Sequence, residues 1–211
     1  MTTDPPTHLN ARKRPRQSRA KATLDAIFEA SIQVLLGDGP QRLTTTRVAE
    51  RAGVSVGTMY QYFPHKQALI YALNERYLEM LAERVEAACR VQHGAPLGRM
   101  VEALVSTYWA AKTERPEVTR VLYQTVVEMD NRALIEAFGA RADAATAAML
   151  ASASDAVFVD LRTVTLTFLT TLFGTVRNLF ERDLPAQDAA AVLGQLKLMC
   201  GAYLESVRTA A

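Results

Sequence analysis

The sequence predicts an all-α fold of about nine helices, with a three-helix head at the N-terminus and a larger helical C-terminal part. Apolar residues recur at spacings of three and four along almost the whole chain, which is the pattern of amphipathic helices. Glycine and proline interrupt this pattern where helices would end. With 211 residues, 49% of them hydrophobic, the chain is long enough and apolar enough to bury a substantial core.

The first predicted helix runs from about residue 18 to residue 36. Its apolar positions follow helical spacing, so one face is expected to point inward. That face consists of Leu24, Ile27, Phe28, Ser31, Val34 and Leu35. Gly37 and the Gly39–Pro40 pair should end the helix. We expect it to pack across the next two helices and so complete the head.

Residues 43–66 predict two short helices joined by a tight turn. Thr44 is the N-cap candidate of the first helix, Gly53 its C-cap, and Ser55 the N-cap of the second. In the second helix, over residues 56–63, Met59 and Phe63 are four apart and share the inward face. The residues left to point outward are Gly57, Thr58, Tyr60, Gln61 and Tyr62.

This pair of helices fits a helix-turn-helix, which places its second helix in the major groove of DNA. An ordinary helical hairpin is the alternative interpretation. The charge distribution favours the helix-turn-helix. Residues 1–66 hold ten basic and five acidic residues, a net charge of +5. Residues 67–211 hold 14 basic and 17 acidic residues, a net charge of −3. The basic excess therefore lies where phosphates would be bound.

The N-terminal segment is polar, contains two adjacent prolines, and is predicted to be a disordered basic arm over residues 1–16. Residues 11–21 carry six basic residues and no acidic one. These residues could reach phosphates or the adjacent minor groove, or they could form a solvated tail. We favour the arm because it adjoins the expected DNA-binding unit.

The rest of the chain predicts one long helix after Lys66, ending before His93, and five further helices. These helices are expected at residues 97–114, 116–129, 133–151, 155–181 and 187–207. Residues 163–168 alternate with period two, which favours a strand, but the wider window steps by threes and fours, which favours a helix. Because the 155–181 helix has two apolar faces, one can meet its own domain and the other a second copy.

Several classes of protein are disfavoured. Cys89 and Cys200 are far apart, without a CxxC or Cys/His cluster, so we expect no metal site and no disulfide, and a cytoplasmic location. The longest uncharged run, residues 163–176, is too short and too polar to span a bilayer. The three histidines fall in the expected tail and loops, and no familiar catalytic motif is present, so we expect no enzyme and no cofactor.

Residues 44–66, TTTRVAERAGVSVGTMYQYFPHK, resemble the DNA-binding signature of the tetracycline-repressor (TetR) family of transcription regulators. The resemblance extends from about Arg19 to Tyr77, and the region beyond is similar only in its helical layout. It implies a helix-turn-helix domain at residues 17–66 and a ligand-binding and dimerisation domain at residues 67–211. His65 departs from the serine cap of many relatives, which could weaken the start of the long helix.

The resemblance also implies roles at double-stranded operator DNA. Thr44, Thr45 and Thr46 would donate to phosphate, and Val56, Gly57 and Gln61 would lie over the groove, where Gln61 could bond an adenine edge. Contacts to the DNA backbone are implied for Ser55, Thr58, Tyr60, Tyr62 and Lys66. Arg47 could be a phosphate ligand or a solvated helix residue. Because Val56 replaces a longer polar or basic residue of many relatives, DNA shape should carry part of the specificity.

In the family the last two helices form the interface of a homodimer, and a small effector binds among the middle helices. The implied interface residues are Leu166, Leu169, Phe173, Phe180, Leu193, Leu196 and Cys200. The candidates for contact with a lipophilic effector are Tyr108, Trp109, Tyr123, Gln124, Thr167 and Thr171. For each of these candidates, plain core packing is the alternative.

The resemblance therefore implies a dimeric regulator, most simply a repressor, which binds a palindromic operator and is released by a small effector. The two DNA-binding heads of a two-fold symmetric dimer contact half-sites that lie about one DNA turn, or a multiple of it, apart. The alternatives are an architectural DNA-binding protein without a ligand and a helical enzyme. The large apolar C-terminal part argues against the first, because it exceeds what dimerisation requires.

Overall fold

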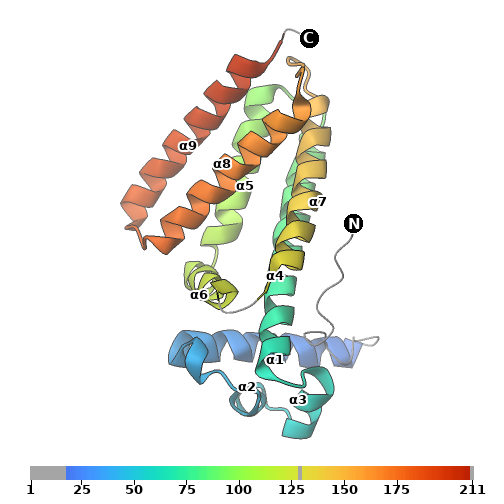
Figure 1. Ribbon diagram of the computed structural model, residues 1–211, viewed down its shortest axis with the longest axis vertical. Coiled ribbons are helices and arrows are strands. Elements are labelled where there is room, and N and C mark those ends of the chain that lie inside the picture. Colours follow the sequence, from blue (N-terminus) through green and yellow to red (C-terminus); the bar gives the residue numbers. More distant parts are fainter. Residues whose placement is uncertain (1–17, 128–129, 210–211) are drawn as a thin grey trace. The chain divides into compact units, whose positions relative to one another are not determined.

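The computed structural model describes residues 18–127 and 130–209, and over these residues the chain consists of helices joined by short non-helical segments, without a β-strand (Figure 1). The expected basic arm at residues 1–16 lies outside the described residues. The α-helices are α1 (Ser18–Asp38), α2 (Thr45–Ala52), α3 (Val56–Tyr62), α4 (Lys66–Val91), α5 (Leu97–Thr113), α6 (Pro116–Val127), α7 (Arg132–Ala151), α8 (Leu161–Glu181) and α9 (Ala186–Val207). A single 3-10 turn, η2 (Pro40–Arg42), joins α1 to α2. The all-α prediction is confirmed.

The chain divides into two compact units. The N-terminal unit comprises residues up to 78 together with 117–135, and the C-terminal unit comprises 79–116 together with 136 onward. Helices α4 and α7 each contribute residues to both units. No helix within residues 18–127 and 130–209 combines the length and apolar character needed to cross a membrane.

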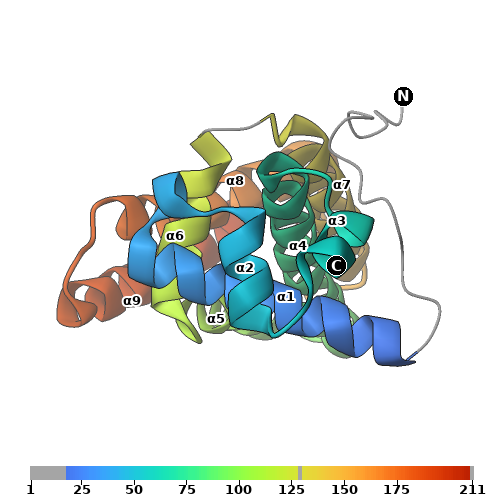
Figure 2. The ribbon, with the colours of Figure 1, turned by 90° about the horizontal axis from the view of Figure 1, so that it is seen from below.

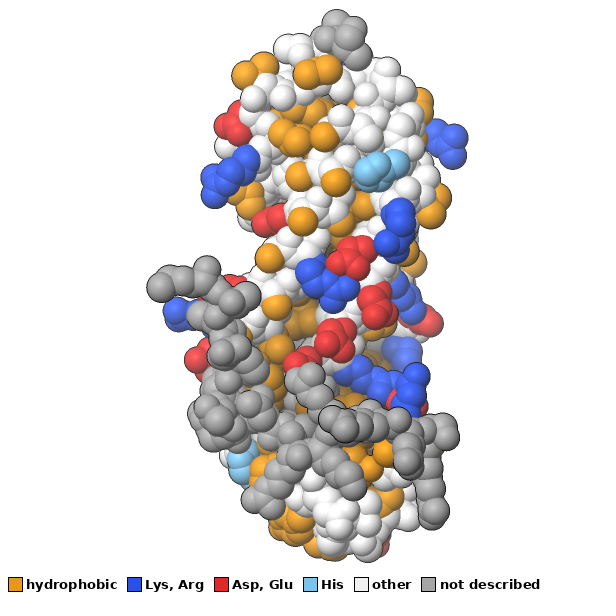
Figure 3. All heavy atoms as spheres, turned by 90° about the vertical axis from the view of Figure 1, so that its right-hand side faces the viewer, with side chains coloured by type: hydrophobic (Ala, Val, Ile, Leu, Met, Phe, Trp, Pro, Cys, Tyr) orange, Lys and Arg blue, Asp and Glu red, His pale blue; other side chains and the backbone are white. Residues whose placement is uncertain are grey.

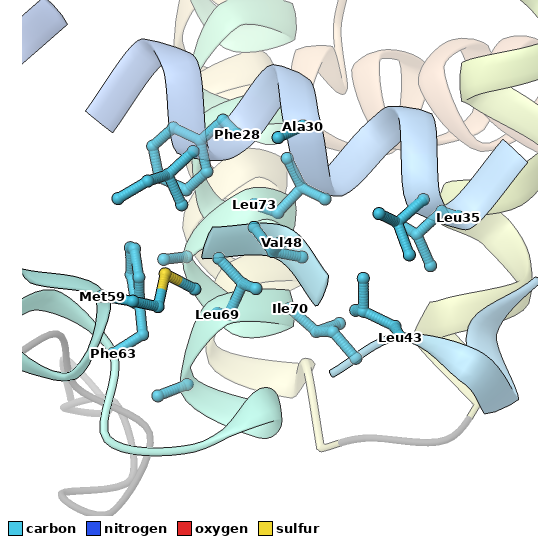
Figure 4. Close-up of a cluster of buried hydrophobic side chains, with 14 of the residues drawn as sticks. Phe28, Ala30, Leu35, Leu43, Val48, Met59, Phe63, Leu69, Ile70 and Leu73 are labelled. Carbon is cyan, nitrogen blue, oxygen red and sulfur yellow. The ribbon is translucent and has the colours of Figure 1, made fainter. Parts of the chain in front are cut away.

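The core of the N-terminal unit forms where α1, α2, α3 and the first turns of α4 converge, and Val118, Val121 and Leu122 of α6 join it. Figure 4 shows side chains from these helices and from the segments that join them gathered in one cluster: Phe28, Ala30, Leu35, Leu43, Val48, Met59, Phe63, Leu69, Ile70 and Leu73. Seen from below, α2 crosses in front of α1 (Figure 2). The predicted three-helix head is therefore present.

Helix ends in the head follow the predicted capping residues. The Thr44 hydroxyl accepts a hydrogen bond from the Arg47 backbone N–H at 3.2 Å, and Gly53 adopts φ 67°, which glycine tolerates best. The Ser55 hydroxyl accepts from the Thr58 N–H at 3.0 Å. These caps fix where α2 ends and α3 begins, and so fix the direction of α3.

The start of α4 is capped by His65, contrary to the expectation that this residue weakens it. The Nδ1 atom of His65 accepts a hydrogen bond from the Ala68 backbone N–H at 3.2 Å. This is the role that a serine or threonine hydroxyl fills at other helix starts. An unprotonated imidazole nitrogen is an acceptor, so the substitution keeps the cap.

In the C-terminal unit, the ambiguous 163–168 stretch is helical, as its wider spacing predicted. The helix α8 begins at Leu161, six residues later than expected, because the Asp160 carboxylate accepts from the Thr163 N–H at 3.0 Å and caps it. Before the cap the chain is held by other contacts. Asp155 accepts from the Leu97 N–H at 2.8 Å, and Val157 forms an isolated antiparallel bridge with Thr209.

Candidate nucleic-acid interface

Helix α3 is locked into the head by the residues predicted to face inward. Met59 and Phe63 are fully buried, and the Phe63 ring lies 5.8 Å from that of Phe28 on α1, measured between centroids. Val48 and Ala49 of α2 are buried in the same core. Burial of these groups holds α3 rigidly, which is what a helix that reads DNA requires.

The opposite face of α3 is open to solvent. Val56 and Tyr60 are each 43% exposed, Gly57 and Gln61 are exposed, and Thr58 is half-buried. These residues carry no charge, so the face presents a hydroxyl, an amide, a phenol and an apolar group. Such a surface can contact base edges and sugars without repelling either.

Two residues assigned to the DNA surface are buried instead. Tyr62 is only 6% exposed, and its ring lies 6.3 Å from that of Phe63. It comes three residues after Met59, so it shares the inward face of α3. Thr45 is buried because it precedes the buried Val48 and Ala49 by three and four residues. The expectation that Tyr62 points outward is therefore wrong, and Thr45 is buried, with 8% of its surface exposed.

The basic residues around the motif have specific partners. Arg47 forms an ion pair with Asp38 at 3.1 Å, and the two side chains are 48% and 40% exposed. The Lys66 Nζ donates to the Pro40 carbonyl at 3.2 Å and so ties the start of α4 to η2. An exposed ion pair contributes only about 0–1 kcal/mol, so a phosphate can replace Asp38 at Arg47 at little cost.

The predicted dimer residues lie mostly inside their own chain. Buried side chains are those of Leu169, Phe180, Leu196 and Cys200. Phe173 packs against the rings of Tyr108 and Phe138, and Leu193 is half-buried. The assignment of the four buried residues to the subunit surface is wrong, because their side chains pack in the subunit's own core, whereas Phe173 and Leu193 remain partly exposed. Of the predicted set only Leu166 is exposed.

The sequence analysis missed the exposed apolar residues of α9. Leu198 is 66% exposed and Met199 is 50% exposed. Gly174 of α8 and Gly194 of α9 are exposed, and a Cβ atom at either position would have no side chain and no other helix within 4 Å. The sequence indicated a helix contact here only through the small residues Ala190, Gly194, Gly201 and Ala202, which leave room for a neighbouring helix.

The effector candidates are distributed over both units. Tyr123, half-buried, and Gln124, exposed, belong to the N-terminal unit. Tyr108, Trp109, Thr167 and Thr171 belong to the C-terminal unit. Among these, Tyr108 is buried against Phe173, with ring centroids 4.6 Å apart, and Thr167 is exposed. Sequence analysis also missed Lys112, a buried lysine one turn after Tyr108.

Two family models match the chain. Residues 27–73 match the model described as bacterial regulatory proteins, tetR family. Residues 96–204, just over half of the chain, match the model of the tetracyclin repressor-like C-terminal domain. The first match contains the helix-turn-helix, and the second contains α8 and most of α9.

Curated relatives include nucleoid occlusion factors named SlmA. That of Haemophilus ducreyi is 33% identical over 123 residues, covering 58% of this chain and 59% of the relative. That of Actinobacillus pleuropneumoniae serotype 7 is 35% identical over 111 residues, covering 52% and 54%. The chain thus matches little more than half the length of these relatives.

Solved structures show the same fold. A TetR-family transcriptional regulator from Streptomyces coelicolor superposes with a TM-score of 0.58 at 25% identity, covering 88% of this chain and 99% of the other. The fatty acid degradation regulator FadR from Bacillus halodurans gives a TM-score of 0.65 at 17% identity, covering 90% and 96%. From the capped helix pair, the layout of nine helices in the described residues and the model matched by more than half of the sequence, we conclude that the chain belongs to the TetR family of bacterial regulatory proteins.

Proposed function

We propose that the protein is a transcriptional repressor that binds a palindromic operator as a homodimer and is released by a small lipophilic effector. The observation that carries the proposal is the exposed, uncharged face of α3, formed by Val56, Gly57, Tyr60 and Gln61, on a helix whose other face is locked in the core. Residues 17–66 would form the DNA-binding domain, residues 67–211 the ligand-binding and dimerisation domain, and residues 1–16 a basic arm.

At the operator, Gln61 would bond a base edge while Val56 and Gly57 allow close approach to the groove. The Thr44 hydroxyl accepts a bond from a backbone N–H, which leaves its O–H to donate to a phosphate. The Ser55 hydroxyl also accepts from a backbone N–H, and it lies 2.9 Å from the Thr58 hydroxyl, so one of these two O–H groups bonds the other and the second is left for a phosphate. Thr46, Thr58, Tyr60, Arg47 and Lys66 complete the proposed phosphate contacts. Tyr62 and Thr45 are not retained, because their side chains are buried.

For the homodimer we propose the exposed side of the two helices that the sequence suggested, and of the residues predicted there only Leu166 is exposed and retained. On this side of α8 and α9, Leu166, Leu198 and Met199 are solvent-exposed and glycines 174 and 194 leave open space. Large exposed apolar side chains beside small residues are characteristic of helix faces that receive another helix. A second copy on this face would hold two α3 helices at a fixed separation.

The remaining parts of the proposal follow from the family. We expect no catalytic activity and a cytoplasmic location, where the operator is accessible. The effector would act by changing the separation of the two heads, so that it alters DNA affinity without touching DNA. The chain's effector contacts are proposed at Tyr108, Trp109 and Thr171 of the C-terminal unit, with Tyr123, Gln124 and Thr167 less favoured because their side chains are more exposed or lie in the other unit.

Binding-site selection with random duplexes tests the proposal. The expected result is a recovered palindrome. At one base position in each half of the palindrome, Gln61→Ala should reduce the free-energy difference between the preferred base and the other bases by about 1–3 kcal/mol, because one bidentate base contact is lost. Fluorescence anisotropy on the single-base variants of the recovered duplex measures this loss.

Gln187→Ala, which alters an exposed glutamine of α9, is the matched control and should bind like the wild type. If the protein showed no preference for any duplex over random competitor at low salt, the proposal would be wrong. If Gln61→Ala weakened binding equally at every base, Gln61 would not be a base-reading residue.

A second candidate function is a DNA-bound factor that does not control a promoter. The similarity to proteins named nucleoid occlusion factors favours it. Immunoprecipitation of the protein on chromosomal DNA distinguishes the two. One or a few promoter sites favour the repressor, whereas many dispersed sites favour the second candidate.

A further inference from the structure

Arg42, the last residue of η2, is an exposed arginine outside the set of proposed operator contacts. Within the described residues its guanidinium has neither a hydrogen bond nor an ion pair. The arginines of α2 differ, because Arg47 pairs with Asp38 and Arg51 donates to Gln33 at 3.3 Å. On the face of the molecule in Figure 3, too, lysines and arginines are intermixed with carboxylates. The guanidinium of Arg42 is therefore available to an anion from outside the chain.

The backbone that carries Arg42 is fixed on both sides. The Arg42 N–H donates to the Gly39 carbonyl at 3.2 Å, and the Leu43 N–H donates to the Pro40 carbonyl at 3.3 Å. The side chain of Leu43 is only 1% exposed and belongs to the core of the head. Arg42 thus projects from a well-anchored turn, so only its own side chain has to be ordered when it binds a ligand.

The direction of the Arg42 side chain follows from the two residues after it. Leu43 and Thr44 have extended backbones, with φ and ψ of −66° and 121° at Leu43 and of −133° and 151° at Thr44. Successive side chains of an extended backbone point to opposite sides, so Arg42 and Thr44 lie on the side opposite the buried Leu43. Both are exposed, as this alternation requires. Arg42 therefore shares a side of the head with a residue proposed to donate to phosphate.

A second proposed phosphate contact lies beside the same turn. The Lys66 Nζ donates to the Pro40 carbonyl at 3.2 Å, so the first residue of α4 reaches η2. Arg42 follows Pro40 by two residues. The turn is thus flanked by Thr44 before α2 and by Lys66 at the start of α4. Three side chains that can donate to phosphate oxygens are gathered in this part of the head.

We propose that Arg42 binds a phosphate of the operator backbone, so that η2 contacts DNA together with α2 and α3. A guanidinium presents N–H donors in a planar fork, which matches two oxygens of a phosphodiester. Such a contact carries no sequence information, but it adds affinity and fixes the register of α3 on the duplex. The inference rests on the proposed DNA binding and extends it to a segment outside the two helices of the motif.

The variant Arg42→Ala of the full-length protein tests the contact, on the selected duplex and on random duplexes. Its affinity for both should fall at least about tenfold, because a charge-assisted hydrogen bond is lost. The slope of log affinity against log salt should fall by about one for each subunit on the duplex. Arg42→Lys keeps the charge and should keep the slope. Circular dichroism and the melting temperature should stay those of the wild type, because the side chain is exposed.

A matched control separates the contact from a change of net charge. Arg99 is an exposed arginine of α5 in the C-terminal unit. Arg99→Ala removes the same charge as Arg42→Ala and should leave both the affinity and the slope unchanged.

Duplexes with single neutral linkages locate the phosphate. Each duplex carries one methylphosphonate at the same place in both half-sites. At one linkage the wild type should lose about as much affinity as Arg42→Ala loses on the unmodified duplex, and the variant should lose little more there. If wild type and variant lost affinity equally at every linkage, Arg42 would act through its long-range charge and not through a contact.

An unchanged slope and affinity in Arg42→Ala, or an equal loss in Arg99→Ala, would overturn the inference. The wild type alone decides the proposed function. A wild type that prefers the selected duplex, with an Arg42→Ala variant that behaves like it, removes only this inference. A wild type that binds every duplex alike, with a lower slope in Arg42→Ala, removes the proposed repressor function and leaves the contact. A wild type that binds no DNA at low salt removes both.

Discussion

At the scale of single residues, the two tyrosines of α3 have opposite environments although they are two positions apart. Tyr60 is 43% exposed, whereas the ring of Tyr62 is in the core. A helix turns about 100° per residue, so two steps move a side chain to the far face. The motif alone suggests that both contact DNA, and only burial distinguishes them.

Replacement of Tyr60 and Lys66 tests the proposed phosphate contacts. The double variant Tyr60→Phe, Lys66→Ala should weaken binding about equally to all duplexes. It should also lower the slope of log affinity against log salt by about one, because one counterion fewer is released. Tyr62→Phe, which alters a buried ring, should leave both quantities unchanged. An unaltered slope in the double variant would contradict the assignment of Lys66.

Lys112 predicts a specific pH dependence of stability. Below pH 7 the lysine is protonated in both the folded and the unfolded chain, and the cost of its burial is fully present. Because its pKa is about 7 in the folded chain and 10.5 ordinarily, the unfolded chain binds more protons between these values. This group's contribution to the free energy of unfolding should therefore rise by about 1.4 kcal/mol per pH unit above pH 7.

Urea unfolding of the wild type and of Lys112→Met, at several values between pH 7 and pH 9, measures this contribution. Lys112→Met should be the more stable protein at pH 7, and its advantage should shrink as the pH rises. A constant difference between the two proteins would show that the lysine does not titrate in this range.

At the scale of elements, capping residues decide where helices begin. Asp160 sets the start of α8, Ser55 that of α3, and His65 that of α4. Sequence patterns identified the helices because apolar spacing persists over many residues. They placed the start of α8 too early because residues 155–159 continue the apolar pattern, whereas the Asp155 carboxylate accepts from the Leu97 N–H and the backbone of Val157 pairs with that of Thr209.

The cap at His65 is open to a direct test by thermal unfolding. His65→Ala should reduce the free energy of unfolding by about 1 kcal/mol, since the Ala68 N–H loses its acceptor. His65→Ser restores an acceptor and should be close to the wild type. Equal losses in both variants would mean that the imidazole contributes through packing and not as a cap.

At the scale of the whole molecule, the proposed homodimer depends on which face of α8 and α9 is free. A charge at Phe173 would disturb the contact with Tyr108 and Phe138 inside the subunit, so it is not a clean probe of dimerisation. Leu198 is a better one, because it is 66% exposed and its replacement leaves the subunit core intact.

Leu198→Asp should convert the dimer to monomer, since a buried carboxylate on each side of the interface would be unpaired. Operator binding should fall with it. Analytical ultracentrifugation gives the oligomeric state, and circular dichroism confirms that the subunit is folded. The exposed Arg90 of α4 provides the control Arg90→Asp, which should remain dimeric. A dimeric Leu198→Asp would place the interface elsewhere.

The helical class, the order and approximate bounds of the helices, and the caps of α2 and α3 could be predicted from the amino-acid sequence. These depend on neighbours within one or two turns, and such neighbours are visible in the sequence. The tertiary structure decided which of two apolar faces is covered: it placed Tyr62, Leu169, Phe180, Leu196 and Cys200 inside and left Leu198 and Met199 outside. It also revealed the burial of Lys112. Burial depends on contacts between helices far apart in the chain, and periodicity gives the spacing of a face but not the partner that covers it.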